Sequence, residues 1–341
     1  NQDVSAHGVG AITVKAEWSA RHIDTLLLLG LPACGKSVIR RCLSADAAQG
    51  SGPGLGLGPM IQLDDYPYVG FMWRINEVVT CAGHGPVFYD EAWETFTDVR
   101  MWGVLTELLN EDHAALDEAV SDLGRPAADW IVGRLEEAHE KVGMPPPLAG
   151  LPAKVRAAVS AEIEEDATRF AADWMARTRP AGSTVVVEFS RGGPEGASPP
   201  LPAPYGYDYT FALISPRILR HAAALYIWVT PEQSRERNLR RARPGEQGST
   251  MHHAVPETTM RTWYGMDDMA WLMVHSDRPG TITVHARGST FHVPAVRFDN
   301  RREIEAVRSD EPPGADGGLD EQGSIGLRAA LTALAGSGVS G

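Results

Sequence analysis

The sequence contains little cysteine and no long apolar run, and both absences limit the kind of protein it encodes. Its 341 residues include three cysteines, which form no C-x-x-C pair and whose odd number argues against a disulfide framework. The longest apolar run, residues 222–229, is far shorter than the ~18 residues of a membrane-spanning helix. No charged segment followed by an apolar one opens the chain, as a secretory signal would require. We therefore expect a cytoplasmic protein with no membrane partner.

Positive charge is scarce as well. The chain has 31 Lys and Arg against 44 Asp and Glu, which makes the formal net charge −13. Bulk attraction to nucleic acid is therefore not expected, and an anionic ligand needs a local basic patch. The H-E-x-x-H motif of zinc hydrolases, the G-x-S-x-G motif of serine hydrolases and the N-K-x-D motif of GTPases are all missing.

What the sequence does contain is a series of short apolar runs that alternate with helical segments. Apolar residues make up 43% of the chain, which is typical of a soluble globular protein. Short, largely apolar runs of strand length predict strands buried in a sheet. They lie at residues 25–29, 60–63, 185–187 and 222–229, with later candidates at 281–284 and 293–298. The alternation predicts an α/β fold with a parallel sheet.

Residues 91–180 interrupt the alternation with a large helical insertion. Apolar residues recur at helical spacing over 101–123 and 155–174, and a Pro/Gly-rich stretch separates the two sets. The insertion carries 18 acidic and 9 basic residues, so it holds most of the net negative charge. We expect a core of residues 1–90 and 181–309, a helical insertion at 91–180 that binds the acceptor, and a flexible tail at 310–341 with a terminal helix at 327–334.

Residues 30–37 read G-L-P-A-C-G-K-S and match G-x-x-x-x-G-K-[ST] at every fixed position. Glycines let successive backbone N–H groups turn toward phosphate oxygens, and a helix predicted from about Ser37 adds its positive end. Lys36 would supply charge to the terminal phosphates, and Ser37 a hydroxyl to Mg²⁺. The loop therefore predicts binding of ATP or GTP with Mg²⁺. The predicted contacts are Gly30, Leu31, Pro32, Ala33, Cys34, Gly35, Lys36, Ser37 and Val38.

This layout resembles the P-loop kinases of small molecules and nucleotides, such as uridine kinase, the zeta-toxin-type kinases and chloramphenicol phosphotransferase. The resemblance is specific in the loop and covers about residues 21–110 and 181–300. It implies a P-loop NTPase-type parallel sheet flanked by helices, with a large helical insertion, and it implies kinase activity.

The resemblance also implies roles for carboxylates that follow two predicted strands. Asp64 is similar to the acidic residue that serves these enzymes as general base for the accepting hydroxyl, and Asp65 would assist it or contact Mg²⁺. Glu188 follows the run 185–187 and resembles a Walker B residue that holds Mg²⁺. Arg191 would grip an acceptor or a phosphate. The alternative for each carboxylate is an ordinary turn or cap at the end of a strand.

A run of arginines resembles the lid of such kinases. Residues 217–243 hold seven Arg and two Glu, and a capping box at Thr230 predicts that a helix starts there. Arg237 and Arg241 lie on one face of that helix and would close on the nucleotide phosphates, with residues 245–253 as the lid loop. A solvated basic helix is the alternative. Asn300, after a late strand, resembles a residue of the loop that packs near adenine.

The acceptor pocket is predicted from residues that follow the second strand or open the insertion, namely Tyr66, Tyr68, Arg74 and Arg100. The leading interpretation is a kinase that moves the γ-phosphoryl group of ATP or GTP to a hydroxyl of a small molecule. A regulatory or assembly NTPase is an alternative from another class. A kinase acting on nucleic-acid ends is a third interpretation, which the acidic charge disfavours. The sequence leaves the acceptor and the oligomeric state open.

Overall fold

A computed structural model of the chain describes residues 22–48, 55–90, 92, 94–118, 120–241, 254–302 and 321–336. The predicted lid loop at 245–253 and tail residues 310–320 and 337–341 lie outside these ranges. The strands are β1 (Thr25–Leu29), β2 (Met60–Asp64), β3 (Thr184–Phe189), β4 (Ala222–Trp228), β5 (Thr281–Ala286) and β6 (Ser289–Asp299).

The helices alternate with these strands, as an α/β fold requires. They are α1 (Lys36–Ala48), α2 (Tyr66–Cys81), α3 (Met101–Ala115), α4 (Ala127–Lys141), α5 (Ala153–Ala176), α6 (Gly206–Leu213), α7 (Pro216–Leu219), α8 (Pro231–Arg241), α9 (Glu257–Thr262), α10 (Met269–Val274) and α11 (Glu321–Gly336).

The described strands form one sheet in the order β2-β3-β1-β4-β6-β5. All neighbouring pairs are parallel except β5 and β6, so the predicted parallel sheet is confirmed for five of the six strands. Strand β5 joins antiparallel because only Arg287 and Gly288 connect it to β6, and a two-residue turn cannot make a parallel crossover. Both residues have positive φ, +49° and +78°, as such hairpin turns require.

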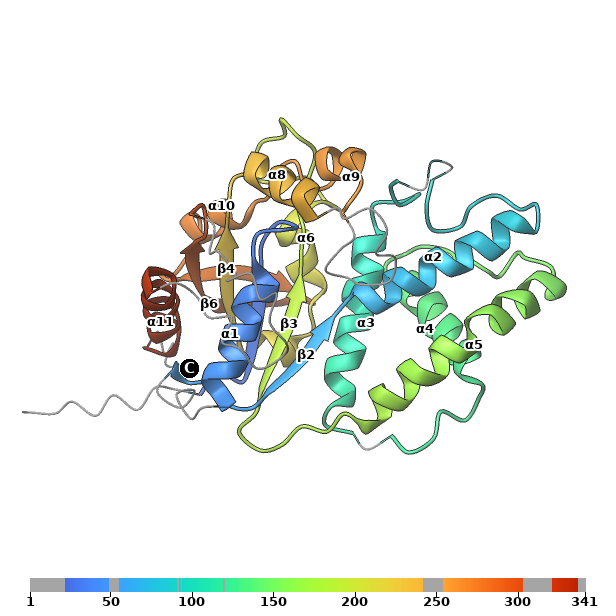
Figure 1. Cartoon of the computed structure of the whole chain (residues 1–341), viewed down its shortest axis with the longest axis horizontal. Coiled ribbons are helices and arrows are strands. Elements are labelled where there is room, and N and C mark those ends of the chain that lie inside the picture. The colour runs from blue at the N-terminus through green and yellow to red at the C-terminus, as the bar shows by residue number, and fades with distance from the viewer. Residues whose placement is uncertain are drawn as a thin grey trace, which may run out of the picture.

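Helices cover both faces of the sheet (Figure 1). On one face α1 and α11 bury apolar residues such as Ile39 and Leu331 against alternate residues of β1, β3 and β4. On the other face α6 and α10 pack with residues such as Phe211 against the opposite set. Helix α11 contains the terminal helix expected at 327–334 and is longer than expected. It belongs to the core, because its apolar face packs on β4 and β6.

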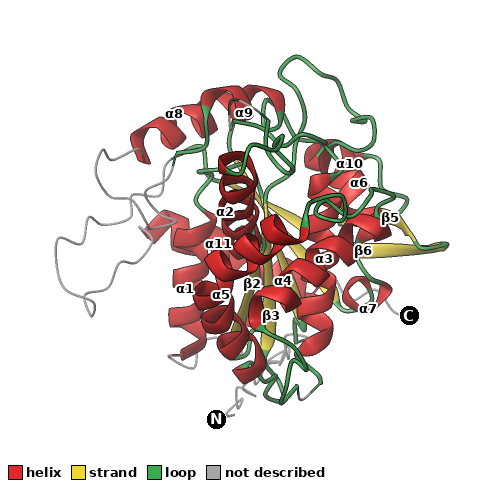
Figure 2. Cartoon of the chain, turned by 90° about the vertical axis from the view of Figure 1, so that its right-hand side faces the viewer, coloured by secondary structure: helices red, strands yellow, loops and turns green. Residues whose placement is uncertain are grey.

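The helical part beside β2 begins earlier than predicted. Helix α2 buries Phe71, Ile75 and Val79 in one apolar cluster with α3, α4 and α5, so this part starts at α2 rather than at residue 91. Figure 2 shows these helices from their own side, with the strands behind them. The sequence predicted neither α2 nor α4, and the helix expected over 101–123 ends at Ala115.

The sheet order puts the end of β1 at a special position. Strand β1 lies between β3 and β4, and the chain runs from β1 through α1 to β2 on one side and continues to β4 on the other. Ligands of open α/β sheets bind at such a reversal, in the crevice beyond the carboxyl ends of the strands. In Figure 1 these ends point toward α8 and α9. None of the described helices combines the length and the apolar character of a bilayer span.

Candidate functional site

The loop between β1 and α1 has a backbone that most residues adopt only with strain. The φ angle is +145° at Gly30, +56° at Ala33 and +104° at Gly35. A Cβ atom on Gly30 would lie 2.4 Å from the carbonyl oxygen of Ile227, and one on Gly35 would lie 2.5 Å from Nδ2 of Asn300, so both positions need glycine. Ala33 carries a strain of about 1–2 kcal/mol in this region, and such strain concentrates at functional sites.

Five backbone N–H groups of this loop have no acceptor among the described residues. The amides of Leu31, Ala33, Gly35, Lys36 and Ser37 form no hydrogen bond within the part of the chain that the structure describes. The last two belong to the first turn of α1, where a helix offers no acceptor of its own and carries its positive end. Open N–H groups in such a loop form an anion-binding site.

Other predicted contacts of the loop use their amides internally. The N–H of Gly30 donates to the hydroxyl of Tyr207 on α6 at 2.7 Å. The N–H groups of Cys34 and Val38 donate to carbonyl oxygens of the loop itself, at 3.3 and 3.1 Å. The amides of Gly30, Cys34 and Val38 are therefore occupied, and the donors left for an anion are the amide of Leu31 and those of Ala33 and residues 35–37.

Lys36 is folded back onto the loop. Its Nζ donates to the carbonyl oxygens of Gly30 at 2.9 Å and Leu31 at 3.2 Å, and to Oγ of Ser190 at 2.7 Å. The side chain is 8% exposed, so these three oxygens take the place of water around the ammonium group. Sequence analysis missed Ser190, although its position two residues after Glu188 was a usable signal.

Helix α8 also holds the loop. Oγ of Ser234 donates to the carbonyl oxygen of Pro32 at 2.6 Å. The predicted capping box that starts this helix is present, because the N–H of Gln233 donates to Oγ1 of Thr230 at 3.2 Å and the side chain of Gln233 accepts from the N–H of Thr230 at 3.1 Å. The cap therefore fixes the start of α8, and Ser234, one turn after Thr230, contacts the loop.

The two predicted lid arginines occupy different environments. Arg237 is buried and donates to the carbonyl oxygens of Asn300 and Arg301, at 2.8 and 3.3 Å. Asn300 in turn donates from Nδ2 to the carbonyl oxygen of Cys34 at 2.7 Å. Arg237 therefore supports the loop indirectly, through Asn300. Arg241 is partly exposed at the end of α8. A role of either guanidinium at nucleotide phosphates stays a prediction.

Asp64 and Glu188 lie next to each other at the carboxyl ends of β2 and β3, where they are register partners. Register partners point to the same face of a sheet, and here that face carries α1. Arg40 of α1 donates to Oε2 of Glu188 at 2.5 Å. Asp64 accepts from Nε2 of Gln62 at 2.9 Å and from the N–H of Tyr66 at 3.1 Å. The predicted carboxylates are thus brought together beside the first turns of α1.

The environment of Asp64 favours its neutral form. Burial, and then the negative charges of Asp65 and Glu188, raise the pKa of Asp64 to about 6, against the opposing effect of Arg40. A carboxyl group whose pKa approaches the working pH is suited to accept and return a proton.

Asp65 is committed to a different partner. Its Oδ2 accepts from Arg191 at 3.0 Å, and the Arg191 guanidinium lies over the rings of Trp102 and Phe189, 5.0 and 5.1 Å from their centroids. Arg191 is 2% exposed, and its Nε has no hydrogen-bond partner among the described residues. Arg191 therefore joins β3 to the helical part and is covered. A role of Arg191 at an acceptor or a phosphate stays a prediction.

The residues predicted to hold Mg²⁺ fit that role unequally. Magnesium in nucleotide sites takes one or two protein oxygens and completes its shell with phosphates and water. Ser37 lies on the face of α1 that also carries Arg40, one turn later, and Arg40 contacts Glu188, so Ser37 and Glu188 fit as hard oxygen ligands. Glu188 and Asp65 are each paired with an arginine, and Glu188 is the one whose partner, Arg40, lies on α1 with Ser37. The described residues contain no group of three His, Cys, Asp or Glu side chains arranged around a metal.

Three predicted acceptor residues lie inside the helical part. Tyr68 is buried and donates to Asp112 at 2.7 Å. Arg74 pairs with Glu162 of α5, and Arg100 pairs with a neighbouring aspartate. All three make internal contacts. The partners of Tyr68 and Arg74 lie 44 and 88 residues away in the chain, so no local pattern marks them, whereas Asp98 lies two residues before Arg100.

Tyr66 is placed as predicted, at the first position of α2 directly after Asp65. It is 43% exposed, and burial together with the charge of Asp64 raises its pKa. Of the four predicted residues of the acceptor pocket, Tyr66 is the one that combines exposure with proximity to Asp64.

A further carboxyl near Lys36 was not predicted. Asp267 is buried, and its carboxylate accepts from the hydroxyl of Tyr226 at 2.9 Å and from the N–H of Met269 at 3.0 Å. Burial raises the pKa of Asp267 to about 7, against the effects of those hydrogen bonds and of Lys36. No motif marks this residue.

Comparison with models of known protein families, with curated proteins and with solved structures finds no match to this chain. The site is therefore interpreted from its own geometry.

Proposed function

We propose that this protein is a phosphotransferase with a P-loop NTPase-type fold that moves the γ-phosphoryl group of ATP or GTP to a hydroxyl group of a small molecule. One observation carries the proposal. Five open backbone amides and a buried lysine lie in one loop at the start of α1, at the reversal point of the sheet order. Amides and ammonium in this arrangement suit the oxygens of a triphosphate.

The side chains around this loop would divide the work of phosphoryl transfer. Lys36 would move from the carbonyl oxygens of its own loop to phosphate oxygens. Ser37 and Glu188 would hold Mg²⁺, which neutralises phosphate charge when bound. Asp64 would orient the acceptor hydroxyl and take its proton. The oxygen of the acceptor then forms a bond to the γ-phosphorus while the bond to the β-phosphate oxygen breaks, leaving a nucleoside diphosphate.

Nucleotide binding is tested by titration calorimetry with Mg-ATP and Mg-GTP, on the wild type and on Lys36→Met. We expect heat of binding for the wild type and a loss of about 10²–10³-fold in phosphoryl transfer for Lys36→Met, by analogy with removal of one preorganised donor. Lys141→Met is the matched control, because Lys141 lies in the helical part and pairs with Glu111. Absence of binding heat in the wild type would contradict the proposal.

The same preparation separates the kinase from a regulatory NTPase. Release of inorganic phosphate that proceeds at full rate without any acceptor, and rises with a protein partner, would favour the NTPase. Transfer of label from the γ-position to an added alcohol supports the kinase.

A further inference from the structure

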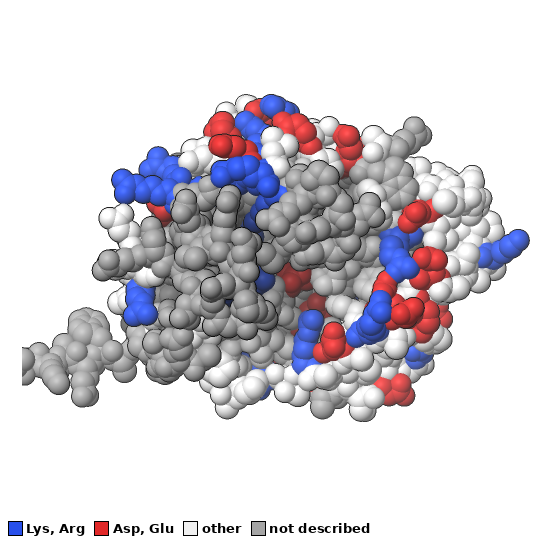
Figure 3. Space-filling view, in the orientation of Figure 1, with Lys and Arg blue, Asp and Glu red and all other residues white. Residues whose placement is uncertain are grey.

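The cations predicted to face the acceptor are already paired within the chain. Arg74 donates to Glu162 at 2.7 Å, Arg100 to Asp98 at 2.6 Å and Arg191 to Asp65 at 3.0 Å. Figure 3 shows the same pattern on one face of the molecule, where acidic and basic side chains lie next to one another over the helical part. A guanidinium that is already bound to a carboxylate offers little to a second anion.

The carboxylates at the ends of β2 and β3 are not neutralised to the same extent. Arg40 pairs with Glu188, but Asp64 forms no ion pair within the described ranges. An acceptor that reaches Asp64 therefore approaches a negative charge. An acceptor with its own phosphate or carboxylate group would be repelled, and its charge would lack a partner after desolvation.

An aromatic surface begins next to Asp64. Tyr66, Gly70 and Trp73 lie on one face of α2 by their spacing of four and three residues, and both aromatic side chains are 43% exposed. The ring of Trp73 packs edge-on against Tyr89, with 5.2 Å between centroids. The space beside Gly70 is open, because a Cβ atom there would meet nothing within 4 Å. Flat exposed rings with a gap between them suit the stacking of a ring or contact with a cation.

We infer that the phosphoryl acceptor is an uncharged or cationic alcohol that contains a ring, held on the Tyr66–Trp73 face of α2 with its hydroxyl at Asp64, and that acceptors carrying a phosphate group are rejected. This inference rests on the proposed kinase function. Tyr66 and Trp73 are binding residues in it, and Asp64 is the residue that contacts the reacting hydroxyl.

The first test measures transfer of labelled γ-phosphate from ATP to matched pairs of acceptors. The pairs are a nucleoside and its 5′-monophosphate, and a hexose and its 6-phosphate, with an aminocyclitol as the cationic member. We expect the uncharged or cationic compounds to exceed their phosphorylated counterparts at least tenfold in kcat/KM. Equal or better use of a phosphorylated member overturns the inference and leaves the kinase function standing. Absence of transfer to every member, with nucleotide binding intact, contradicts both.

The second test adds a cation to the face of α2. Gly70→Arg has room for its side chain, and Gly70→Gln is the matched uncharged control. We expect Gly70→Arg to raise kcat/KM for the phosphorylated member of the preferred pair at least tenfold over Gly70→Gln. Equal values for the two variants would show that the charge near α2 does not decide acceptor choice.

The third test addresses the aromatic surface. Trp73→Leu should raise the KM for the preferred acceptor at least fivefold and leave the KM for ATP unchanged. Val274→Ala is the control, because Val274 is an exposed apolar residue of α10 outside this face. An unchanged acceptor KM in Trp73→Leu overturns the placement on α2.

Discussion

At the scale of single residues, Asp64 combines a functional position with an unfavourable environment. It lies beside Glu188 in the sheet register and is mostly withdrawn from water, and burial is the largest cause of its raised pKa. A charged group kept in such a place destabilises the folded state, and proteins retain such groups where function needs them. The pH dependence of activity and the stability of an Asp64 variant therefore each test this description of the residue.

The first concerns activity. If Asp64 is the base, phosphoryl transfer requires its ionised form, so kcat/KM for the acceptor should rise with pH through about 6, the raised pKa of Asp64. Asp64→Asn should lower transfer by at least about 10²-fold and remove this rise, with nucleotide affinity nearly unchanged. A large loss of nucleotide affinity in Asp64→Asn would reassign the residue to the metal.

The second concerns stability. Since folding raises the pKa of Asp64 from 3.8 to about 6, the folded state holds the proton more tightly and loses stability as pH rises through that window. Asp64→Asn should therefore raise the free energy of unfolding at pH 8 by about 1–3 kcal/mol, and much less at pH 4. Urea titration measures this, with the exposed Asp277→Asn as control. Lower stability of Asp64→Asn at pH 8 would contradict it.

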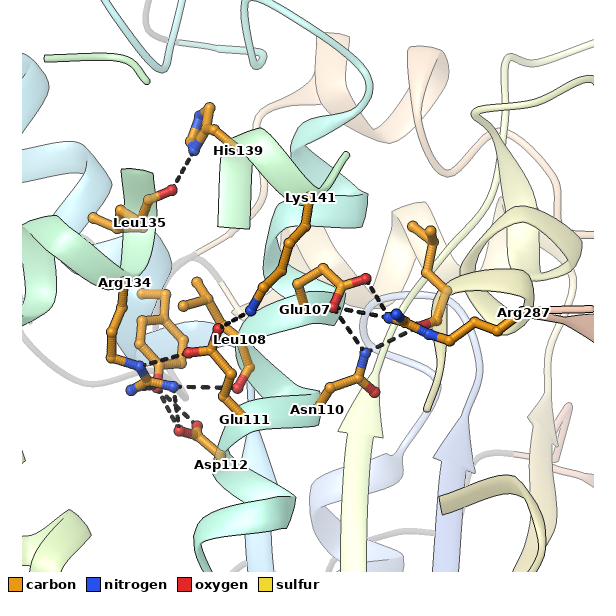
Figure 4. A network of polar contacts seen from close by, with 12 residues as sticks. Glu107, Leu108, Asn110, Glu111, Asp112, Arg134, Leu135, His139, Lys141 and Arg287 are labelled. Atoms are coloured by element: carbon orange, nitrogen blue, oxygen red, sulfur yellow. Dashed lines mark hydrogen bonds and ion pairs between the residues drawn. The ribbon is translucent and has the colours of Figure 1, made fainter. Parts of the chain in front are cut away.

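At the scale of elements, the helical part is organised around Arg134 of α4. Its guanidinium donates to Glu111 at 2.9 Å and to Asp112 at 2.8 Å, both on α3 (Figure 4). The same group lies 4.8 Å from the ring centroid of Trp130 and 5.5 Å from that of Trp174 on α5. One buried cation thus joins three helices, with the aromatic rings shielding it from water.

Removing one member of this network should leave a buried charge uncompensated. Arg134→Leu should lower the free energy of unfolding by about 3–5 kcal/mol, and Asp112→Asn by a smaller amount because it keeps part of the hydrogen bonding. The double variant should lose less than the sum of the two. Urea unfolding of all four proteins in a double-mutant cycle gives the coupling, and additive losses would show that the pair is not coupled.

The same view shows how α3 is tied to the other edge of the sheet. Arg287, in the turn between β5 and β6, donates to Glu107 at 2.7 Å, and Asn110 donates to the carbonyl oxygen of Leu213 at 2.9 Å. Helix α3 therefore belongs both to the helical part and to the layer that covers the sheet. This explains how a large insertion keeps a fixed position beside β2.

At the scale of the whole molecule, His113 of α3 links the helical part to the start of β1. Its Nε2 lies 3.2 Å from Oγ1 of Thr25, and its Nδ1 has no partner in the described part of the chain. Burial, and then the charges of Arg179 and Arg217, lower the pKa of His113 to about 4, against the effects of Asp117 and Asp24. The folded protein therefore holds this imidazole neutral.

This predicts an acid-sensitive fold. A lowered pKa means that the contribution of His113 to stability is complete above pH 6.5 and is lost as pH falls from there through about 4, by about 3 kcal/mol at most. Asp64 acts in the opposite sense between about pH 6 and 4, so the net change is smaller. His113→Gln should flatten the fall in unfolding free energy between pH 7 and 4. The exposed His285→Gln should not, and an unchanged pH dependence in His113→Gln would contradict this role.

Sequence and structure agree best where neighbours in the chain decide the outcome. The run of leucines in β1, the glycines of residues 30–37 and the capping box at Thr230 act within a few residues, and the structure has each element at its predicted place. They disagree where partners are distant. The pairing of Arg74 with Glu162 spans 88 residues, and no local pattern marks it. Helix α2 was not predicted, although its buried residues Phe71, Ile75 and Val79 recur at helical spacing.

The sequence by itself determined the alternation of buried strands and helices, the strained glycine loop before α1, and the carboxylates that end β2 and β3, because dihedral freedom, apolar spacing and strand length are local properties. Only the tertiary structure decided which charges remain available. It paired Arg191 with Asp65 and Arg74 with Glu162, placed Ser190 on Lys36 and left Tyr66 exposed beside Asp64. Electrostatic pairing and burial depend on what folding brings within a few ångströms, and separation along the chain does not encode that distance.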